Sequence, residues 1–212
     1  MKMLCVASLF AIVVLPQAAL ADDLLSAPWR GQENTTCQVW EFLTPQATDI
    51  YPDGTPPGAL PPGPSTRVLY ITPNAGAAWL PADAGRPGVW PLSGQMQVHV
   101  ENYILPNPWK EMWMQITWRP QVTGEQPHFI DLYPVASAPP ELVLEQSLEA
   151  PWVHSTYVWH YSPNPDYEDF RIFGDINVDE LIVETRCYVP EPATTALLGL
   201  GGLGMLARRR RR

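Results

Sequence analysis

An alternating stretch around Trp113 carries the residues best suited to bind a ligand. In an extended strand, alternate side chains share one face. On this basis one face carries four candidate glycan-binding residues: Trp109, Glu111, Trp113 and Gln115. The two indoles would lie roughly 13 Å apart, a spacing that suits two separated sugar rings, with Glu and Gln bonded to hydroxyl groups. The alternative is that loops cover this face, or that the indoles fill the core.

Acidic residues near the end of the body raise the question of a metal site. The stretch from Asp175 to Asp179 copies the opening of a calcium loop, but Glu180 stands where that loop needs glycine. The stretch is therefore not an EF-hand. A structural calcium held by Asp175 or Asp179 together with Glu33 or Glu41 remains a hypothesis, and a solvated acidic turn is the alternative. No other cofactor is expected.

Signatures of common enzymes are absent from the sequence. It contains no Gly-x-Ser-x-Gly, no His-Glu-x-x-His, no phosphate loop and no dinucleotide fingerprint. Glycoside hydrolysis needs only two carboxylates about 5 to 9 Å apart, and Glu101 and Glu111 on predicted neighbouring strands are a conceivable pair. We therefore expect a non-catalytic protein, with a glycoside hydrolase or a polysaccharide-modifying enzyme as the alternative.

The body that positions these residues is predicted to be all-β. Runs with period-two alternation are separated by clusters of Pro, Gly, Asn and Asp, and helical periodicity is almost absent. We predict strands at residues 36–43, 67–71, 94–103, 111–119, 128–133, 142–145, 154–161, 170–173 and 179–188. This number of strands suits an antiparallel β-sandwich of the jelly-roll kind. The proline-rich residues 52–64 are expected to form an exposed loop.

The N-terminus has the features of a secretory signal peptide, which we assign to residues 1–21. Lys2 precedes an apolar run at residues 4–15, and residues 19–21, Ala-Leu-Ala, form a small-x-small cleavage site. Cleavage there would make Asp22 the first residue of the exported chain.

The body itself, residues 22–189, is predicted to be one strongly acidic domain. It has 7 Lys and Arg against 21 Asp and Glu, a formal net charge of about −14. Such a surface repels phosphate backbones, so nucleic acid is excluded as a partner.

Two cysteines remain after the signal peptide is removed, Cys37 and Cys187. Disulfides persist outside the cytoplasm, so we predict a Cys37–Cys187 disulfide. In the chain-entropy model it would contribute roughly 5 kcal/mol. The bridge would bring the first and last strands together as neighbours. Two unpaired, buried thiols are the alternative.

The C-terminal residues 190–212 form a separate segment. Pro190, Glu191 and Pro192 precede an uncharged stretch at residues 193–207 and five arginines at 208–212. The stretch is shorter than the roughly 20 apolar residues that comfortably span a bilayer. The arginines orient it with its C-terminal end in the cytoplasm, so the body is expected outside.

This order of features resembles the PEP-CTERM sorting signal of Gram-negative bacteria. The resemblance implies that the tail forms a transmembrane helix and holds the protein transiently in the inner membrane. An exosortase, a membrane protease, would then remove it near the Pro-Glu-Pro motif. The implied location is the cell envelope, the cell surface or the extracellular matrix, where polysaccharide is the candidate partner. A permanent tail anchor is the alternative.

The body has weaker resemblances of its own. The stretch from Phe170 to Cys187 is similar to the last strands of galactose-binding-like jelly rolls, in which an acidic residue, here Asp179, leads the final strand. The whole body is similar to exported proteins of planctomycete-type bacteria that carry PEP-CTERM tails. These resemblances imply a fold and an exported location. Related sandwiches often carry a structural calcium.

Overall fold

The computed structural model describes residues 22–55, 65–72, 78–92, 94–102, 108–136 and 138–188. The predicted signal peptide and the predicted sorting tail, including Pro190, Glu191 and Pro192, lie outside the described residues. Most of the proline-rich stretch lies outside them as well. Among the residues that are described, no helix is long and apolar enough to cross a membrane.

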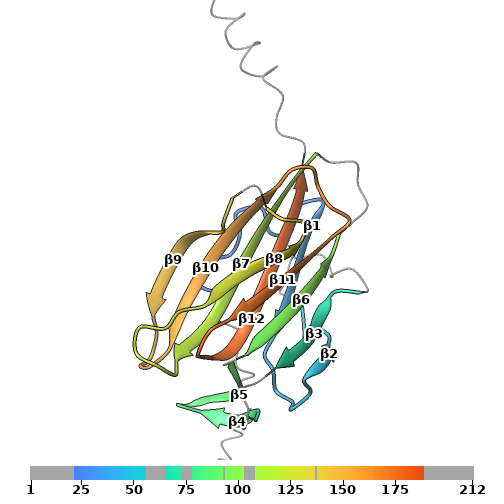
Figure 1. Ribbon diagram of the computed structural model, residues 1–212. Coiled ribbons are helices and arrows are strands. Elements are labelled where there is room, and N and C mark those ends of the chain that lie inside the picture. The colour runs from blue at the N-terminus through green and yellow to red at the C-terminus, as the bar shows by residue number, and fades with distance from the viewer. Residues whose placement is uncertain are drawn as a thin grey trace, which may run out of the picture.

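Two antiparallel sheets make up the body (Figure 1). Sheet A has the order β4-β5-β12-β7-β10-β9, with β1 also paired to β12, and sheet B has the order β2-β3-β6-β11-β8. The strands are β1 (Thr35–Trp40), β2 (Thr48–Ile50), β3 (Arg67–Thr72), β4 (Leu80–Asp83), β5 (Arg86–Leu92), β6 (Gln95–Glu101), β7 (Trp109–Pro120), β8 (His128–Tyr133), β9 (Glu141–Ser147), β10 (Val153–Tyr161), β11 (Tyr167–Phe173) and β12 (Ile176–Tyr188).

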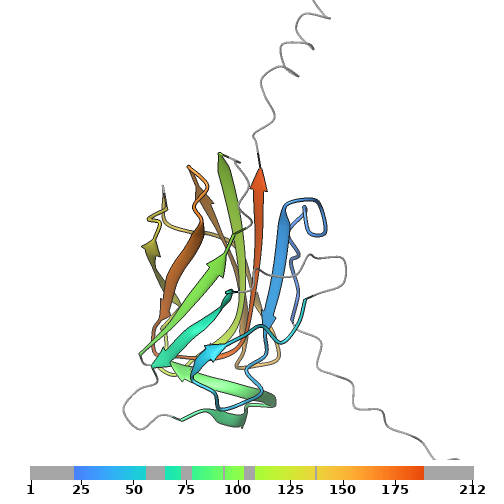
Figure 2. The same ribbon diagram turned by 90° about the vertical axis from the view of Figure 1, so that its right-hand side faces the viewer.

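The inward faces of the two sheets enclose one apolar core. Met112 and Met114 of β7 in sheet A, and Met96 and Val98 of β6 in sheet B, all belong to a single buried cluster. Period-two alternation produces this directly, because every second residue of a strand points inward. The view turned by 90° shows the two layers edge-on, with β1 beside β12 (Figure 2). The predicted all-β class is confirmed, and the two facing sheets support the predicted sandwich.

All nine predicted strands are found, with ends that differ by a few residues. Three strands were not predicted. Strand β2 has only three residues, too few to show a pattern. Strands β4 and β5 contain Pro81, Pro87 and Pro91, and proline within a run argues against a strand because it cannot donate a ladder hydrogen bond.

A buried ion pair joins the two sheets at one end of the core. The Lys110 ammonium of β7 contacts the Glu168 carboxylate of β11, and both side chains are essentially inaccessible to solvent. Asn102 accepts from Lys110 and donates to Glu168 Oε1 at 2.9 Å. Asn102 also donates to the Pro165 carbonyl oxygen. The pair thus fixes the position of the loop between β10 and β11.

The two cysteines lie on adjacent strands but do not form the predicted disulfide. Strand β1 does pair with β12, so the predicted neighbourhood of the first and last strands is confirmed. Cys37, however, lies opposite Glu184, which leaves Cys187 three positions further along and on the other face of the sheet, about 10 Å away. A disulfide needs Cα atoms roughly 4.4 to 6.8 Å apart. The prediction of this bridge was therefore wrong.

Cys37 is expected to be alkylated when the unreduced protein is unfolded in denaturant, to the same extent as after reduction. In the native protein it should react slowly, because burial, together with Glu184, raises the pKa of its thiol and only the thiolate is nucleophilic. Peptide mass spectrometry after alkylation measures both. Recovery of a peptide pair joined through Cys37 and Cys187 would contradict the register.

Candidate functional site

The predicted glycan-binding face of β7 points away from the core, but the chain's own N-terminal segment, residues 22–30, lies across it. Several hydrogen bonds hold this segment to outward-facing side chains of sheet A. The Ala27 amide donates to Glu184 at 3.0 Å, and Arg30 Nε donates to the same carboxylate at 2.5 Å. Glu184 is fully buried as a result.

The polar groups expected to bind sugar hydroxyls are bonded within the protein. Gln115 is only 1% exposed; its amide oxygen accepts from the Leu25 amide at 3.2 Å, and its amide nitrogen donates to Asp23 at 2.9 Å. The Glu111 carboxylate accepts from the indoles of Trp29 and Trp113, at 3.1 and 2.5 Å. These bonds match the alternative stated for this face, in which a loop of the protein covers it.

The indoles on this face are divided between the surface and the covered region. Trp109, at the start of β7, is 39% exposed, whereas Trp113 is half-buried and bonded to Glu111. The aromatic side chains of β10 belong to the core: Tyr157, Trp159 and Tyr161 are each less than a tenth exposed.

The conceivable catalytic pair is separated by the sandwich. Strands β6 and β7 follow one another in the chain but lie in different sheets, so Glu101 and Glu111 occupy the two opposite outer faces. Packed sheets are about 10 Å apart, and the outward direction of both side chains adds to that distance. Trp29, Trp113 and Arg186 also hold the pKa of Glu111 below its ordinary value, although burial opposes this. A general acid in glycoside hydrolysis needs the opposite shift.

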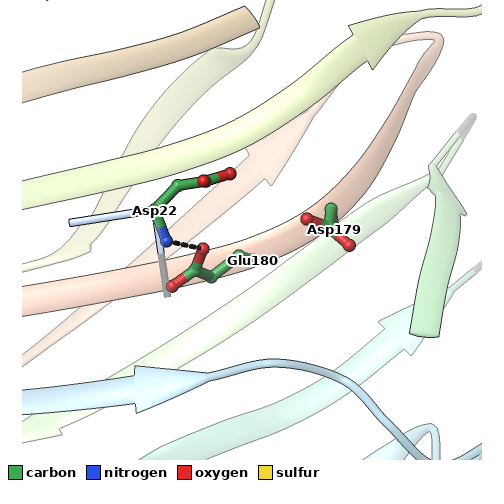
Figure 3. A group of neighbouring side chains, drawn as sticks. All are labelled: Asp22, Asp179 and Glu180. Atoms are coloured by element: carbon green, nitrogen blue, oxygen red, sulfur yellow. Dashed lines mark hydrogen bonds between the residues drawn. The ribbon is translucent and has the colours of Figure 1, made fainter. Parts of the chain in front are cut away.

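A carboxylate cluster lies where the N-terminal segment begins. A β-bulge in β12 between Val178 and Glu180 leaves Asp179 without a partner on β7, and Asp179 and Glu180 together approach Asp22 (Figure 3). The Asp22 amide donates to Glu180 Oε2 at 2.7 Å. The Arg86 guanidinium contacts the carboxylates of Asp22 and Asp179.

Burial and like charges shift the acidities in this cluster. Burial raises the pKa of Glu180 to about 8, opposed by the Asp22 amide and reinforced by the charges of Asp22, Asp179 and Glu41. Burial likewise raises the pKa of Asp179 to about 6, although Arg86 opposes the shift. Glu180 is thus the carboxylate of this cluster that is hardest to ionise.

The cluster bears on the predicted calcium. Oxygen atoms of Asp22, Asp179 and Glu180 lie within 4.8 Å of one another. Asp179, one of the two candidate calcium ligands, therefore has acidic neighbours. Neither Asp175 nor Glu33 is part of this group. Because the Arg86 guanidinium already neutralises two members, we assign no metal to the cluster.

The outer face of sheet B carries a row of three rings across three strands. The rings of Tyr133 on β8 and Tyr167 on β11 have centroids 4.6 Å apart, and Tyr167 lies 5.1 Å from His99 on β6. The register explains the row, because Asp169 of β11 is opposite both His99 and Tyr133. Asp169 bonds His99 Nδ1 at 2.8 Å. We call Tyr133, Tyr167, His99 and Asp169 the ring row.

The ring row continues into a pocket of about 280 Å³. The pocket is lined by residues from the loop after β8 and the loop between β10 and β11. They include Tyr133, Tyr161, Asn164 and Asp166, together with the prolines of these two loops. Asn102, which bonds both members of the Lys110–Glu168 pair, also holds one lining residue: its backbone amide donates to the Asp166 carbonyl oxygen at 3.1 Å. Tyr133 is 45% exposed and forms the rim between pocket and sheet.

The sequence pattern indicates part of this face of sheet B. Gln97, His99 and Glu101 alternate with buried residues along β6, and this polar alternation is visible in the sequence. The matching alternation on β11 begins at Tyr167, but the predicted strand began at Phe170. Tyr167 and Asp169 therefore lay outside the predicted strand, and their place on the same face as His99 was not predicted.

Comparison with known proteins identifies only the tail. Residues 189–212 match the family model of the PEP-CTERM protein-sorting motif. No curated protein and no solved structure matches the chain. The motif indicates a protein that is exported to the cell envelope or surface and processed by an exosortase, a membrane-associated enzyme. The resemblances of the body to galactose-binding-like domains and to planctomycete proteins stay predictions.

In a chain that retains residues before Asp22, stability should fall as pH rises from about 5 to 8. The folded protein holds a proton on Glu180 in this range and the unfolded chain does not, so unfolding becomes easier by up to about 1.4 kcal/mol per pH unit. Urea unfolding at several pH values measures the slope.

The matched variant for this prediction is Glu180→Gln, which keeps an oxygen for the Asp22 amide but has no proton to lose. Its stability should depend less on pH than that of the parent chain over the same range. Equal slopes in the two proteins would show that Glu180 is not the group responsible.

Proposed function

We propose that this protein is a non-catalytic component of the cell surface or extracellular matrix that binds polysaccharide through the ring row. The observation that carries the proposal is the row itself, three rings in contact on one sheet face, each tilted by 31° or 36° to its neighbour, with the Asp169 carboxylate bonded to His99. Tyrosine rings offer an apolar face and a polar edge, which matches the C–H faces and hydroxyl groups of sugars.

The charge of the body narrows the class of polysaccharide. With a formal net charge of about −14 over residues 22–189, the domain repels anionic polymers. A neutral polysaccharide is therefore the proposed ligand. The pocket beside Tyr133 would take a branch or a chain end, with Asp166 and Asn164 as hydrogen-bonding groups.

The non-catalytic part of the proposal rests on the separation of Glu101 and Glu111 on the two outer faces. A polysaccharide-cleaving or polysaccharide-modifying enzyme of jelly-roll fold is the alternative. It predicts release of reducing sugar from the bound polymer, whereas a binding module leaves the polymer intact.

The proposed route begins with cleavage of the signal peptide after Ala21 in a Gram-negative host. The hydrophobic stretch at residues 193–207 then holds the protein transiently in the inner membrane, with the arginines at 208–212 on the cytoplasmic side. Removal of the tail by the exosortase releases the body to the surface or matrix.

Tyr167→Ala is expected to weaken polysaccharide binding about tenfold, because loss of a stacked ring removes on the order of 1.4 kcal/mol. Affinity electrophoresis in gels containing xylan, galactan, soluble cellulose derivatives that carry no charge, or the host's own matrix polysaccharide measures the effect. Circular dichroism checks that the variant folds.

The matched control is Tyr51→Ala, because Tyr51 is a tyrosine outside the ring row and is 56% exposed. It should bind like the parent protein. Unchanged binding by a folded Tyr167→Ala variant would refute the ring row as the binding face, and release of reducing sugar would favour the enzyme.

Replacing Pro190, Glu191 and Pro192 together by alanine should abolish tail removal, because the motif is the feature by which the exosortase substrate is identified. The protein should accumulate at its uncut mass in the membrane fraction of the native host. Fractionation and intact mass measurement test this. Normal release of the alanine variant would contradict the assigned role of the motif.

A further inference from the structure

The carboxylate of Glu180 has no cationic partner among the described residues, although it is only 4% exposed. Its Oε2 accepts one hydrogen bond, from the Asp22 amide at 2.7 Å, and its buried Oε1 has no hydrogen-bond partner in the described part of the chain (Figure 3). A buried carboxylate without a partner is costly. A cation at the position of the Asp22 nitrogen would compensate the negative charge of this carboxylate.

The charges around Glu180 are mostly negative and would favour such a cation. Asp22, Asp179 and Glu41 add negative charge near Glu180, and Arg86 is the basic side chain that contacts the group, through Asp22 and Asp179. Four carboxylates are thus faced by one guanidinium. A second positive charge would reduce this imbalance.

The predicted processing of the chain supplies that charge at the right atom. Hydrolysis of the Ala21–Asp22 bond adds the hydroxyl of a water molecule to the Ala21 carbonyl carbon and its proton to the Asp22 nitrogen. The amide nitrogen thereby becomes an α-amino group, which is largely protonated at neutral pH. The atom that already donates to Glu180 would then carry a positive charge and three N–H donors.

We propose that Glu180 is the binding site for the α-ammonium group of the processed chain, so that removal of the signal peptide completes a buried ion pair. The inference rests on cleavage after Ala21 and is independent of the polysaccharide-binding proposal. The proposal predicts which form of the chain is the more stable. The precursor folds into a less stable body than the exported chain, and full stability is reached only after the cut.

The test compares two full exported chains, residues 22–212 in mild detergent, that differ only at the α-amino group. One begins with a free Asp22 and the other is acetylated on the Asp22 nitrogen, which keeps one N–H donor but removes the charge. At pH 7 the acetylated chain should melt on the order of 5 °C lower. Equal melting temperatures would overturn the proposal.

Glu180→Gln in both chains assigns the effect to the proposed partner. In this background the difference between free and acetylated chains should nearly vanish, because an uncharged amide gains little from an ammonium group. The matched control is Glu33→Gln, an exposed carboxylate on the same N-terminal part of the chain, which should leave the difference intact. A difference that survives in the Glu180→Gln chains would overturn the proposal.

A second measurement does not depend on the stability of any variant. Acylation of the α-amino group by a succinimidyl ester at pH 7 should be at least tenfold slower in the folded free chain than in the same chain in urea, because the paired ammonium is held protonated. Equal rates, corrected for urea with a model peptide, would overturn the proposal. A rise in melting temperature with calcium that requires Glu180 would also overturn it, since a metal would then fill the place of the ammonium.

Discussion

Glu184 is fully buried on the outward face of β12, and this burial is compatible with folding only because Arg30 and the Ala27 amide bond its carboxylate. An unpaired buried charge is among the most destabilising features a protein can contain. The course of the N-terminal segment follows from this constraint, because its donors are spaced to meet the acids of β12. The same requirement explains the Lys110–Glu168 pair inside the core.

The two outer faces of the sandwich consequently differ in character. On sheet A, the polar side chains of Gln115 and Glu184 are hydrogen-bonded to residues 22–30. On sheet B, Tyr133 of the ring row is exposed, and Tyr167, His99 and Asp169 are half-buried. The face with the tryptophans is thus the one that residues 22–30 cross, and the ring row lies on the other sheet.

Period-two alternation made the strands predictable, because it reports which residues share a face. It found nine strands and correctly separated Trp113 and Gln115 from Met112 and Met114. It cannot report what lies on top of a face. The cover over Gln115 comes from Leu25 and Asp23, which are 90 or more positions away in the chain and belong to a segment with no regular pattern. Register is equally hidden, and for this reason Cys37 and Cys187 were wrongly paired although their strands are neighbours.

Strand β12 has a further consequence because it ends at Tyr188, directly before the matched sorting motif at 189–212. Any tension on the tail is transmitted along the axis of this strand. Strand β7 flanks β12 on one side and β1 and β5 flank it on the other, with hydrogen bonds perpendicular to the pulling direction. These bonds are loaded together in shear rather than opened one after another. The body is therefore built to resist a force applied at its C-terminal end.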